Sequence, residues 1–464
     1  MYINYKNAGT WKINNAGQGY AGEIYIDEEK GLIILSIHIS HSGGPLSYLE
    51  LPYHIPFVVG ELSNCAQLSL IDCQRIRTET ILGSGDTFVY QVKYLVNGYT
   101  FDCEDDIVFD SFKVKFSNLF DWSQISCLTN RKIENDYVIA YNDVDTITLY
   151  SSEKVKISYQ ISSNFITDFM NEITELKQIP YIVLESQSAQ PLEFFQNYII
   201  QIKSLIEIGI GQKVDITKTI AEISKCNIEV DDRTTHHNFE IIQNYQKSKK
   251  YSKINLHELL FSLNDFKEKD LSTWFNGYEE MQPVIELFVE DLTNHHLSLE
   301  RRFLNIVQAL EVYHGRKRFH GSNRAEYRKY INNKLMNSNQ EAIKQYLLCG
   351  DNSKSKPNFV LLKERLYDLF IGDYNFFFNT RGLTQEKMDF PKKVADTRNY
   401  LTHYDLKSKD KAFEGNELKK SYEILQLILL YYILIEIGFD NEFIHDKIMS
   451  LQRDYEDHDS FMSM

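Results

Sequence analysis

The spacing of apolar residues changes partway along this chain, and that change constrains the fold more than any other feature. From residue 1 to about 160, short alternating or apolar runs predict about nine strands. From Leu256 onward the apolar residues recur with helical spacing. At 464 residues the chain is too long for one ordinary core. We therefore expect an α+β multidomain protein, with a β-rich, sandwich-like N-terminal domain over residues 1–240 and a C-terminal all-α helical bundle over residues 255–464.

The N-terminal half consists of strand-like runs separated by turn residues. Ile24–Ile26 and Leu32–Ile39 flank Asp27–Gly31 and predict a hairpin. Further strand-like runs are Ala66–Leu70, Phe88–Val96, Ile107–Phe116, Val138–Tyr141, Ile147–Tyr150 and Val155–Ile161. Short strands at this spacing predict a sandwich or a barrel.

The pattern after residue 161 is mixed. Phe165–Leu176 has helical spacing, Ile179–Leu184 is strand-like, and Leu192–Ile208 has the spacing of an amphipathic helix. The polar stretch Glu229–Lys253 then separates the strands from the helices. We expect the domain boundary within it.

The helical half begins its longest periodic run at Leu299, with Gly315 as the expected stop. Further predicted helices are Arg324–Met336, Gln340–Leu348, Phe359–Phe370, a helix from about Pro391 to His403, and Glu417–Ile437. The last is apolar almost all round, so we expect it to be the hub of the bundle, ended by Gly438.

The charge of the chain is distributed unevenly. The net charge is −15, which argues against a protein that coats nucleic acid with its whole surface. Residues 301–420 nevertheless hold 24 Lys and Arg against 14 Asp and Glu, a balance of +10, whereas the remainder carries −25. A surface that binds a polyanion is therefore expected in the helical half.

Other features indicate a cytoplasmic protein without a membrane segment. The six cysteines are scattered with no Cys-x-x-Cys pair, as reduced thiols would be. The first residues lack the apolar core of a signal peptide. The longest apolar run, Leu427–Ile435, is too short to cross a bilayer.

The stretch Asp396–Asp405 carries the residues with the clearest chemistry. On the helix expected from Pro391, Asn399 and His403 are four residues apart and share a face, whereas Arg398 and His403 diverge by about 140°. The alternative is that Arg398 bonds a nearby carboxylate such as Asp396 or Asp405, and that His403 is an ordinary polar residue near a helix end.

An Arg, a polar residue and a His on a helix that precedes a long apolar one resemble the signature of the HEPN ribonucleases. The segment Leu299–Arg316 resembles the first long helix of the ApeA-like HEPN branch. The strand-rich half, which opens with Gly9-Thr10-Trp11, resembles the ApeA N-terminal domain. The resemblance covers nearly the whole chain.

This resemblance implies an antiphage protein that acts by abortive infection. Residues 1–240 would be a sensor or scaffold domain that responds to a phage-derived trigger, and residues 255–464 would be an HEPN ribonuclease. The family works as a homodimer in which the two Arg/His helices meet. Its substrate would be structured host RNA such as tRNA, cleaved without a metal or other cofactor.

The residue types fit that chemistry. Histidine is the side chain suited to proton exchange near neutral pH, so His403 can manage the proton of the ribose 2′-OH or of the leaving group. Arg398 can bind phosphate oxygens with its guanidinium group, and Asn399 can hold the imidazole or the phosphate in position. No metal is required, because the 2′-OH makes the substrate its own nucleophile.

The resemblance also implies supporting roles for Glu311 and His314. These two residues lie one turn apart, so a local hydrogen bond between them is the alternative. If it is functional, Glu311 could orient Arg398 across the bundle.

A basic segment follows the first bundle helix, where it forms either an RNA-binding surface or a solvated helix face. Its candidate RNA-binding residues are Arg316, Lys317, Arg318, Arg324, Arg328 and Lys329. No His or carboxylate set has metal-ligand spacing, and no phosphate-binding loop is present.

A non-catalytic HEPN scaffold for dimerisation or RNA binding is the alternative function. The presence of Arg398, Asn399 and His403 together favours the enzyme.

Overall fold

The computed structural model divides the chain into two compact units. One comprises Met1–Ile206 with Val214–Asp270, and the other comprises Glu207–Lys213 with Leu271–Met464. The division after Asp270 lies beyond residue 255, where the sequence placed the start of the helical domain. The structure describes residues 6–15, 17–27, 30–40, 51–81, 85–133, 136–168, 170–226, 228–230, 233–235, 237–243, 254, 259–334, 359–372, 385–404 and 409–458.

The first unit is built on an antiparallel sheet of twelve strands, which confirms the β-rich N-terminal domain. The strands of this sheet are β1 (Asn7–Ile13), β2 (Tyr20–Asp27), β3 (Leu32–Ser40), β4 (His54–Leu62), β5 (Gln67–Ile81), β6 (Gly85–Asn97), β7 (Val108–Phe116), β10 (Ile147–Ser151), β11 (Val155–Asp168), β12 (Ile173–Pro191), β13 (Ile216–Glu222) and β16 (Asn238–Gln243). Two separate hairpins pair β8 (Leu128–Ile133) with β9 (Asp136–Tyr141) and β14 (Ile228–Val230) with β15 (Arg233–Thr235).

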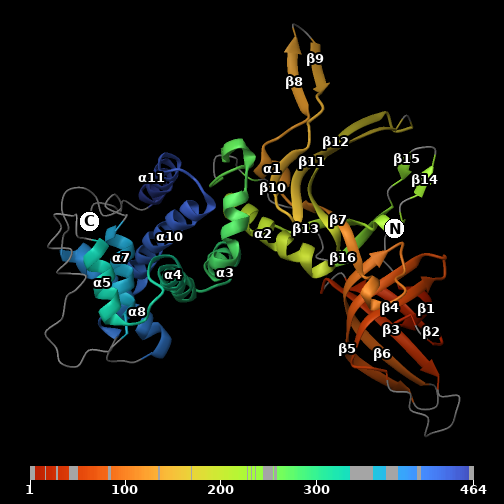
Figure 1. Ribbon diagram of the computed structural model, residues 1–464, viewed down its shortest axis with the longest axis horizontal. Helices are drawn as coiled ribbons and strands as arrows, with labels where there is room; N and C mark the ends of the chain where they lie inside the picture. The colour runs from red at the N-terminus through yellow and green to blue at the C-terminus, as the bar shows by residue number, and fades with distance from the viewer. Residues whose placement is uncertain are drawn as a thin grey trace. The chain divides into compact units, whose positions relative to one another are not determined.

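Six of these strands close into a barrel, one of the two architectures that the sequence predicted. Their order is β6-β3-β2-β1-β4-β5, and β5 pairs again with β6 to complete the circle (Figure 1). The expected hairpin between β2 and β3 is present, with Ala21 opposite His38 and Asp27 opposite Leu32.

Strand β6 belongs to the barrel and to the open part of the sheet at once. One of its edges pairs with β5 from Gly85 to Asn97. Its other edge pairs with β3 as far as Val92 and then with β16 from Tyr94 onward. The open part continues from β16 through β13, β7, β12 and β11 to β10.

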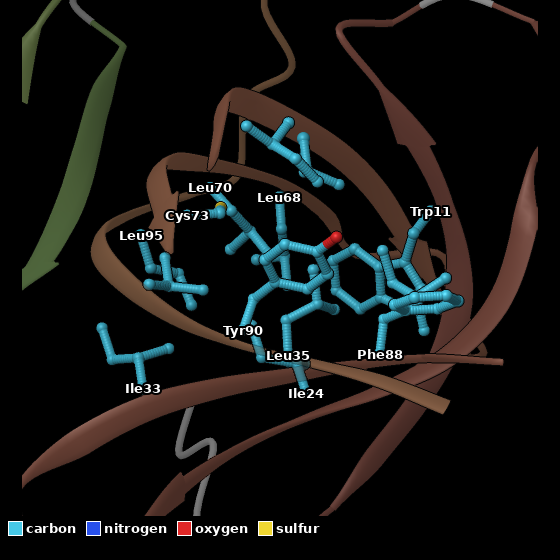
Figure 2. Close-up of a cluster of buried hydrophobic side chains, with 14 of the residues drawn as sticks. Trp11, Ile24, Ile33, Leu35, Leu68, Leu70, Cys73, Phe88, Tyr90 and Leu95 are labelled. Carbon is cyan, nitrogen blue, oxygen red and sulfur yellow. The ribbon is translucent and has the colours of Figure 1, made fainter. Parts of the chain in front are cut away.

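Side chains fill the barrel, as Figure 2 shows for Tyr90 and its apolar neighbours. The hydroxyl of Tyr90 donates to the backbone oxygen of Pro52 at 2.8 Å, which satisfies the buried polar group. The indole of Trp11 is fully buried and lies against the backbone at Gly22 and Gly60, where an added Cβ would overlap it. Gly60 is therefore required by the close approach of the Trp11 ring, and Gly22 by that ring together with the backbone oxygen of Ser36.

The predicted helix over Phe165–Leu176 is wrong, because these residues form the outer part of the β11–β12 hairpin. Phe165 pairs directly with Leu176 across it, and the pairing continues inward to Val155 opposite Ser186. Phe165 is 67% exposed, so its apolar spacing does not mark a buried helix face. Pairing between the two strands decides the conformation here, and the spacing of apolar residues within one segment does not reveal such pairing.

The amphipathic helix predicted after this hairpin is confirmed as α2 (Leu192–Ile210). Its Phe195 ring stacks on Phe112 of β7 with centroids 4.4 Å apart, which packs the helix on the sheet. A short helix, α1 (Leu119–Ser123), follows β7.

The second unit is helical, as predicted. Its described helices are α3 (Ser272–Thr293), α4 (Leu299–Tyr313), α5 (Arg324–Lys334), α7 (Leu362–Gly372), α8 (Gln385–His403), α10 (Gly415–Ile437) and α11 (Asn441–His458). Ser298 starts α4 by accepting the Arg301 N–H at its hydroxyl. Gly438 ends α10 with φ of 105°, a left-handed conformation that glycine adopts without strain. Helix α10 contacts α3, α4 and α11, so the expected hub is confirmed.

Two helix ends differ from expectation. The first bundle helix does not end at Gly315, because a π-helical turn, His314–Arg318, extends α4. Helix α8 begins at Gln385, so Pro391 lies inside it and not in its first turn. Phe390 packs near Phe370 and Phe413, which holds the earlier turns although proline removes one backbone hydrogen bond.

The predicted helix Gln340–Leu348 lies outside the described residues. Within the described ranges, no helix combines the length and the apolar character needed to span a membrane.

Candidate active site

Helix α8 carries the three candidate catalytic residues on its outer side. Its inner side is fixed by Val394 and Leu401, which are buried, and by Thr397. The Thr397 hydroxyl donates to the Lys393 carbonyl at 2.7 Å and accepts the Phe413 N–H at 2.9 Å. Anchored in this way, the helix leaves Arg398 half-buried and exposes Asn399 and His403.

Arg398 is held between a neighbouring helix and its own. Its Nη2 donates to Glu311 Oε2 of α4 at 3.3 Å, and its Nη1 donates to Asn399 Oδ1 at 3.2 Å. The side chains of Arg398 and Glu311 are 36% and 35% exposed, so the pair lies at the surface of the unit. Arg398 thus pairs with Glu311 across the bundle, the contact that the family resemblance implied, whereas the alternative named carboxylates close to it along the chain.

His403 is the last residue of α8 and is exposed. The described hydrogen bonds and ion pairs do not join its ring to Arg398 or Asn399. On an ideal helix the side chains of Arg398 and His403 diverge by about 140°. Arg398 and Asn399 therefore form one contact pair, and His403 stands apart from it on the same helix.

His314 is buried at the start of the π-helical turn, and both of its ring nitrogens are engaged. Its Nδ1 lies 3.0 Å from Arg365 Nη1, which can only donate, so Nδ1 must accept. The proton is then on Nε2, which donates to Asp368 Oδ2 at 2.9 Å. Burial lowers the pKa of His314, and the bond to Asp368 opposes that effect only in part. His314 therefore links α4 to α7 as a neutral side chain.

Asp368 is the centre of this buried network. Besides the bond from His314, it accepts from the Tyr330 hydroxyl at 3.0 Å and from Lys334 Nζ at 2.8 Å. Burial raises the pKa of Asp368, but the His314 bond and the Lys334 charge outweigh it and bring the pKa to about 2. Sequence reasoning missed Asp368 and Arg365. The available signal was the pair of carboxylates, Glu364 and Asp368, one turn apart on a predicted bundle helix.

The basic segment of the π-helical turn is attached to neighbouring helices. Arg316 Nη1 donates to the Glu280 carbonyl of α3 at 2.7 Å. Lys317 Nζ lies 2.7 Å from Glu280 Oε2 and 2.9 Å from Glu436 Oε2 of α10. The guanidinium of Arg318 lies over the Tyr432 ring, 5.5 Å from its centroid. These three cations hold α3, α4 and α10 together, whatever else they bind.

One predicted RNA-binding residue requires correction. Arg324 is only 7% exposed and forms a buried ion pair with Glu364 of α7, so its guanidinium does not face solvent. The fixed charge of Glu364 explains the burial, since an unpaired arginine would be too costly to desolvate. Arg328 is half-buried and Lys329 is exposed on the same helix. Among described residues, no group of three or more His, Cys, Asp or Glu side chains is arranged to hold a metal.

Two family models match the chain. ApeA N-terminal domain 1 matches residues 6–274, which is more than half of the chain. ApeA-like HEPN matches residues 304–443, which contain Glu311, Arg398 and His403. No curated protein and no solved structure matches.

Proposed function

The chain belongs to the ApeA family, since ApeA N-terminal domain 1 is followed by an ApeA-like HEPN domain, and from this we propose that it is an antiphage endoribonuclease. It would cleave structured host RNA such as tRNA and stop phage growth by abortive infection. The N-terminal unit would respond to a phage-derived trigger. The observation that carries the proposal is the placement of Arg398, Asn399 and His403 at the solvent-exposed side of one anchored helix.

The proposed chemistry uses each of these residues once. His403 takes the proton from the ribose 2′-OH or gives one to the leaving 5′-oxygen, and water or the second His403 of a dimer handles the other proton, which exposure to solvent at the end of α8 permits. Arg398 stabilises the charge that develops on the phosphate oxygens. Its contacts with Glu311 and Asn399 restrict the guanidinium before RNA binds. The products are a 2′,3′-cyclic phosphate and a 5′-hydroxyl, and no step requires a metal.

A second copy of the chain would complete the site. One copy presents Arg398 and His403 at a wide angle, because they diverge by about 140° on α8. Two copies related by a two-fold axis would bring two arginines and two histidines to a shared groove. We propose a homodimer in which the His403 side chains face each other. A monomer that keeps full activity at high dilution would contradict this arrangement.

The test is cleavage by the purified full-length protein. We expect cleavage of tRNA in EDTA, with 2′,3′-cyclic phosphate or 3′-phosphate ends, and a loss of about 10²- to 10⁴-fold in rate for His403→Ala. His445→Ala is the matched control, because His445 is an exposed histidine on α11. Products with 5′-phosphate and 3′-hydroxyl ends, or strict dependence on Mg²⁺, would refute the mechanism.

The Glu311–Arg398 ion pair also suits a second candidate function, a non-catalytic scaffold for dimerisation or RNA binding. In that case Arg398 would serve only to join α4 to α8. The two functions differ in cells: a nuclease is toxic when activated, and His403→Ala relieves the toxicity. A scaffold would give no such difference. Sequencing of RNA ends after activation would identify the cleaved RNA.

A further inference from the structure

Tyr404 directly follows His403 and is 65% exposed. Within the described part of the helical unit, the other strongly exposed aromatic ring is Phe359, at 57%. Tyr404 differs from Phe359 in its place, because it adjoins a candidate catalytic side chain.

The backbone and a neighbouring ring restrict Tyr404. Its φ is 52°, the left-handed region in which glycine or asparagine usually ends a helix. Its N–H donates to the Tyr400 carbonyl at 2.6 Å and closes the last turn of α8. The Tyr400 ring meets the Tyr404 ring nearly edge to face, at 5.8 Å and 66°. The left-handed backbone and the neighbouring ring thus set where the exposed ring of Tyr404 lies.

Tyr400 and Tyr404 lie beside the polar pair Asn399 and His403. Asn399 and His403 are separated by one helical turn, and so are Tyr400 and Tyr404. Tyr400 is displaced from Asn399 by one residue, about 100° around the axis of an ideal helix, and Tyr404 directly follows His403, the last residue of α8. A nucleotide whose phosphate lies at His403 would thus have an aromatic ring within its own length.

We propose that Tyr404 is the stacking platform for the base next to the scissile phosphate, so that the substrate is RNA with an unpaired nucleotide at the cleavage point. This inference rests on the proposed ribonuclease function. A base can stack on an aromatic side chain only when it leaves its own helix, as in loops, bulges and single strands. Every base has an aromatic face, so the platform selects unpaired structure rather than a particular base.

The experiment measures KM and kcat of the full-length protein on an RNA hairpin with an unpaired loop and on a fully paired duplex containing the same strand. Tyr404→Asn removes the ring but suits the left-handed backbone, and Tyr404→Phe keeps the ring. We expect Tyr404→Asn to raise KM for the hairpin by about 5- to 150-fold, the range that corresponds to base stacking, with little change in kcat. Tyr404→Phe should behave as the unmodified protein. Phe359→Asn is the control for loss of an exposed ring elsewhere.

A binding measurement separates this inference from the proposed function. Cleavage is blocked with His403→Ala, and 2-aminopurine replaces the loop base beside the mapped cleavage point. Stacking on Tyr404 should quench its fluorescence, and adding Tyr404→Asn should abolish the quenching. Unchanged KM, or equal cleavage of the duplex, would overturn the platform while leaving the nuclease intact. Loss of dimerisation in Tyr404→Asn would also overturn the platform, because it would assign the exposed ring to the proposed dimer interface. Failure of the unmodified protein to bind or cleave RNA would overturn both.

Discussion

Glu311 Oε2 lies 3.3 Å from Nη2 of Arg398, so a carboxylate on α4 holds the guanidinium on α8. The two side chains are about one-third exposed, and such pairs contribute at most about 1 kcal/mol to stability. We therefore propose that this contact matters because it positions the Arg398 guanidinium and not because it stabilises the fold.

Replacing Glu311 by Ala should lower the rate of RNA cleavage by up to about 10²-fold, because Arg398 loses its fixed position. Glu311→Gln keeps an acceptor for the guanidinium and should recover part of the rate. The measurement is kcat together with the melting temperature, and Glu300→Ala on the same helix is the control. An active Glu311→Ala variant, or a loss explained by unfolding, would contradict the positional role.

Charge reversal should have different effects at Lys317 and Lys329. Lys317→Glu would place a third carboxylate beside Glu280 and Glu436, so we expect a clear loss of melting temperature. Lys329 is exposed on α5, and Lys329→Glu should leave melting unchanged. If Lys329 contacts a phosphate, its reversal should also flatten the salt dependence of RNA binding by about one counterion. If the salt dependence of RNA binding is unchanged, Lys329 is a solvated surface residue that does not contact RNA.

The buried His314–Asp368 pair predicts acid sensitivity of the helical unit. The pKa of His314 in the folded protein lies below its usual 6.5. As the pH drops through 6.5, the histidine is therefore protonated in the unfolded chain before it is protonated in the folded one. The free energy of unfolding falls as a result. Asp368 adds a second loss of stability between pH 3.8 and about pH 2, where its carboxyl group is protonated in the unfolded chain but not in the folded protein. Its pKa shift corresponds to about 2 kcal/mol.

His314→Gln tests this linkage, because glutamine can donate to Asp368 and accept from Arg365 without titrating. We expect the melting temperature of the unmodified protein to fall between about pH 7 and pH 5, and His314→Gln to flatten that dependence. Asp368→Asn should cost about 3–5 kcal/mol, since it removes the buried carboxylate that pairs with Lys334. Parallel pH profiles for the unmodified protein and His314→Gln would exclude His314 as the source.

A methyl group at Gly60 should destabilise the barrel by about 1–3 kcal/mol, because it would overlap the Trp11 ring. Gly277→Ala on α3 is the contrasting change. An added Cβ there meets no described atom within 4 Å and should stabilise the helix by about 1 kcal/mol. Urea unfolding followed by Trp fluorescence and circular dichroism would measure both. Equal stability of the Gly60→Ala variant would show that the Trp11 ring can move aside.

The sequence predicted those elements whose period and ends are set locally. Helix α10 ends at Gly438 as expected, because a left-handed glycine is a local requirement. The period did not reveal that Phe165 pairs with Leu176, since that pairing depends on a partner strand. It also did not reveal the closure of β5 on β6, which no spacing rule encodes.

The same distinction applies to the candidate site. Arg398, Asn399 and His403 could be proposed as a site because they lie within one helix. The contact of Glu311 with Arg398 was anticipated as a consequence of the family resemblance rather than of spacing. The burial of Arg324 was missed, because its partner Glu364 lies on another helix and a basic run looks the same in sequence whether solvated or paired.

The position of β6 also bears on the order in which the chain can fold during synthesis. All six barrel strands come from one continuous stretch, Asn7–Asn97, so the barrel can close while the rest of the chain is still being translated. The open sheet has no such independence, because β7 lies between β12 and β13 and must wait for both. When β16 is finally translated, the unoccupied end of β6 is already in place as its template. Nascent chains long enough to release Asn97 from the ribosome should therefore already resist protease over the barrel.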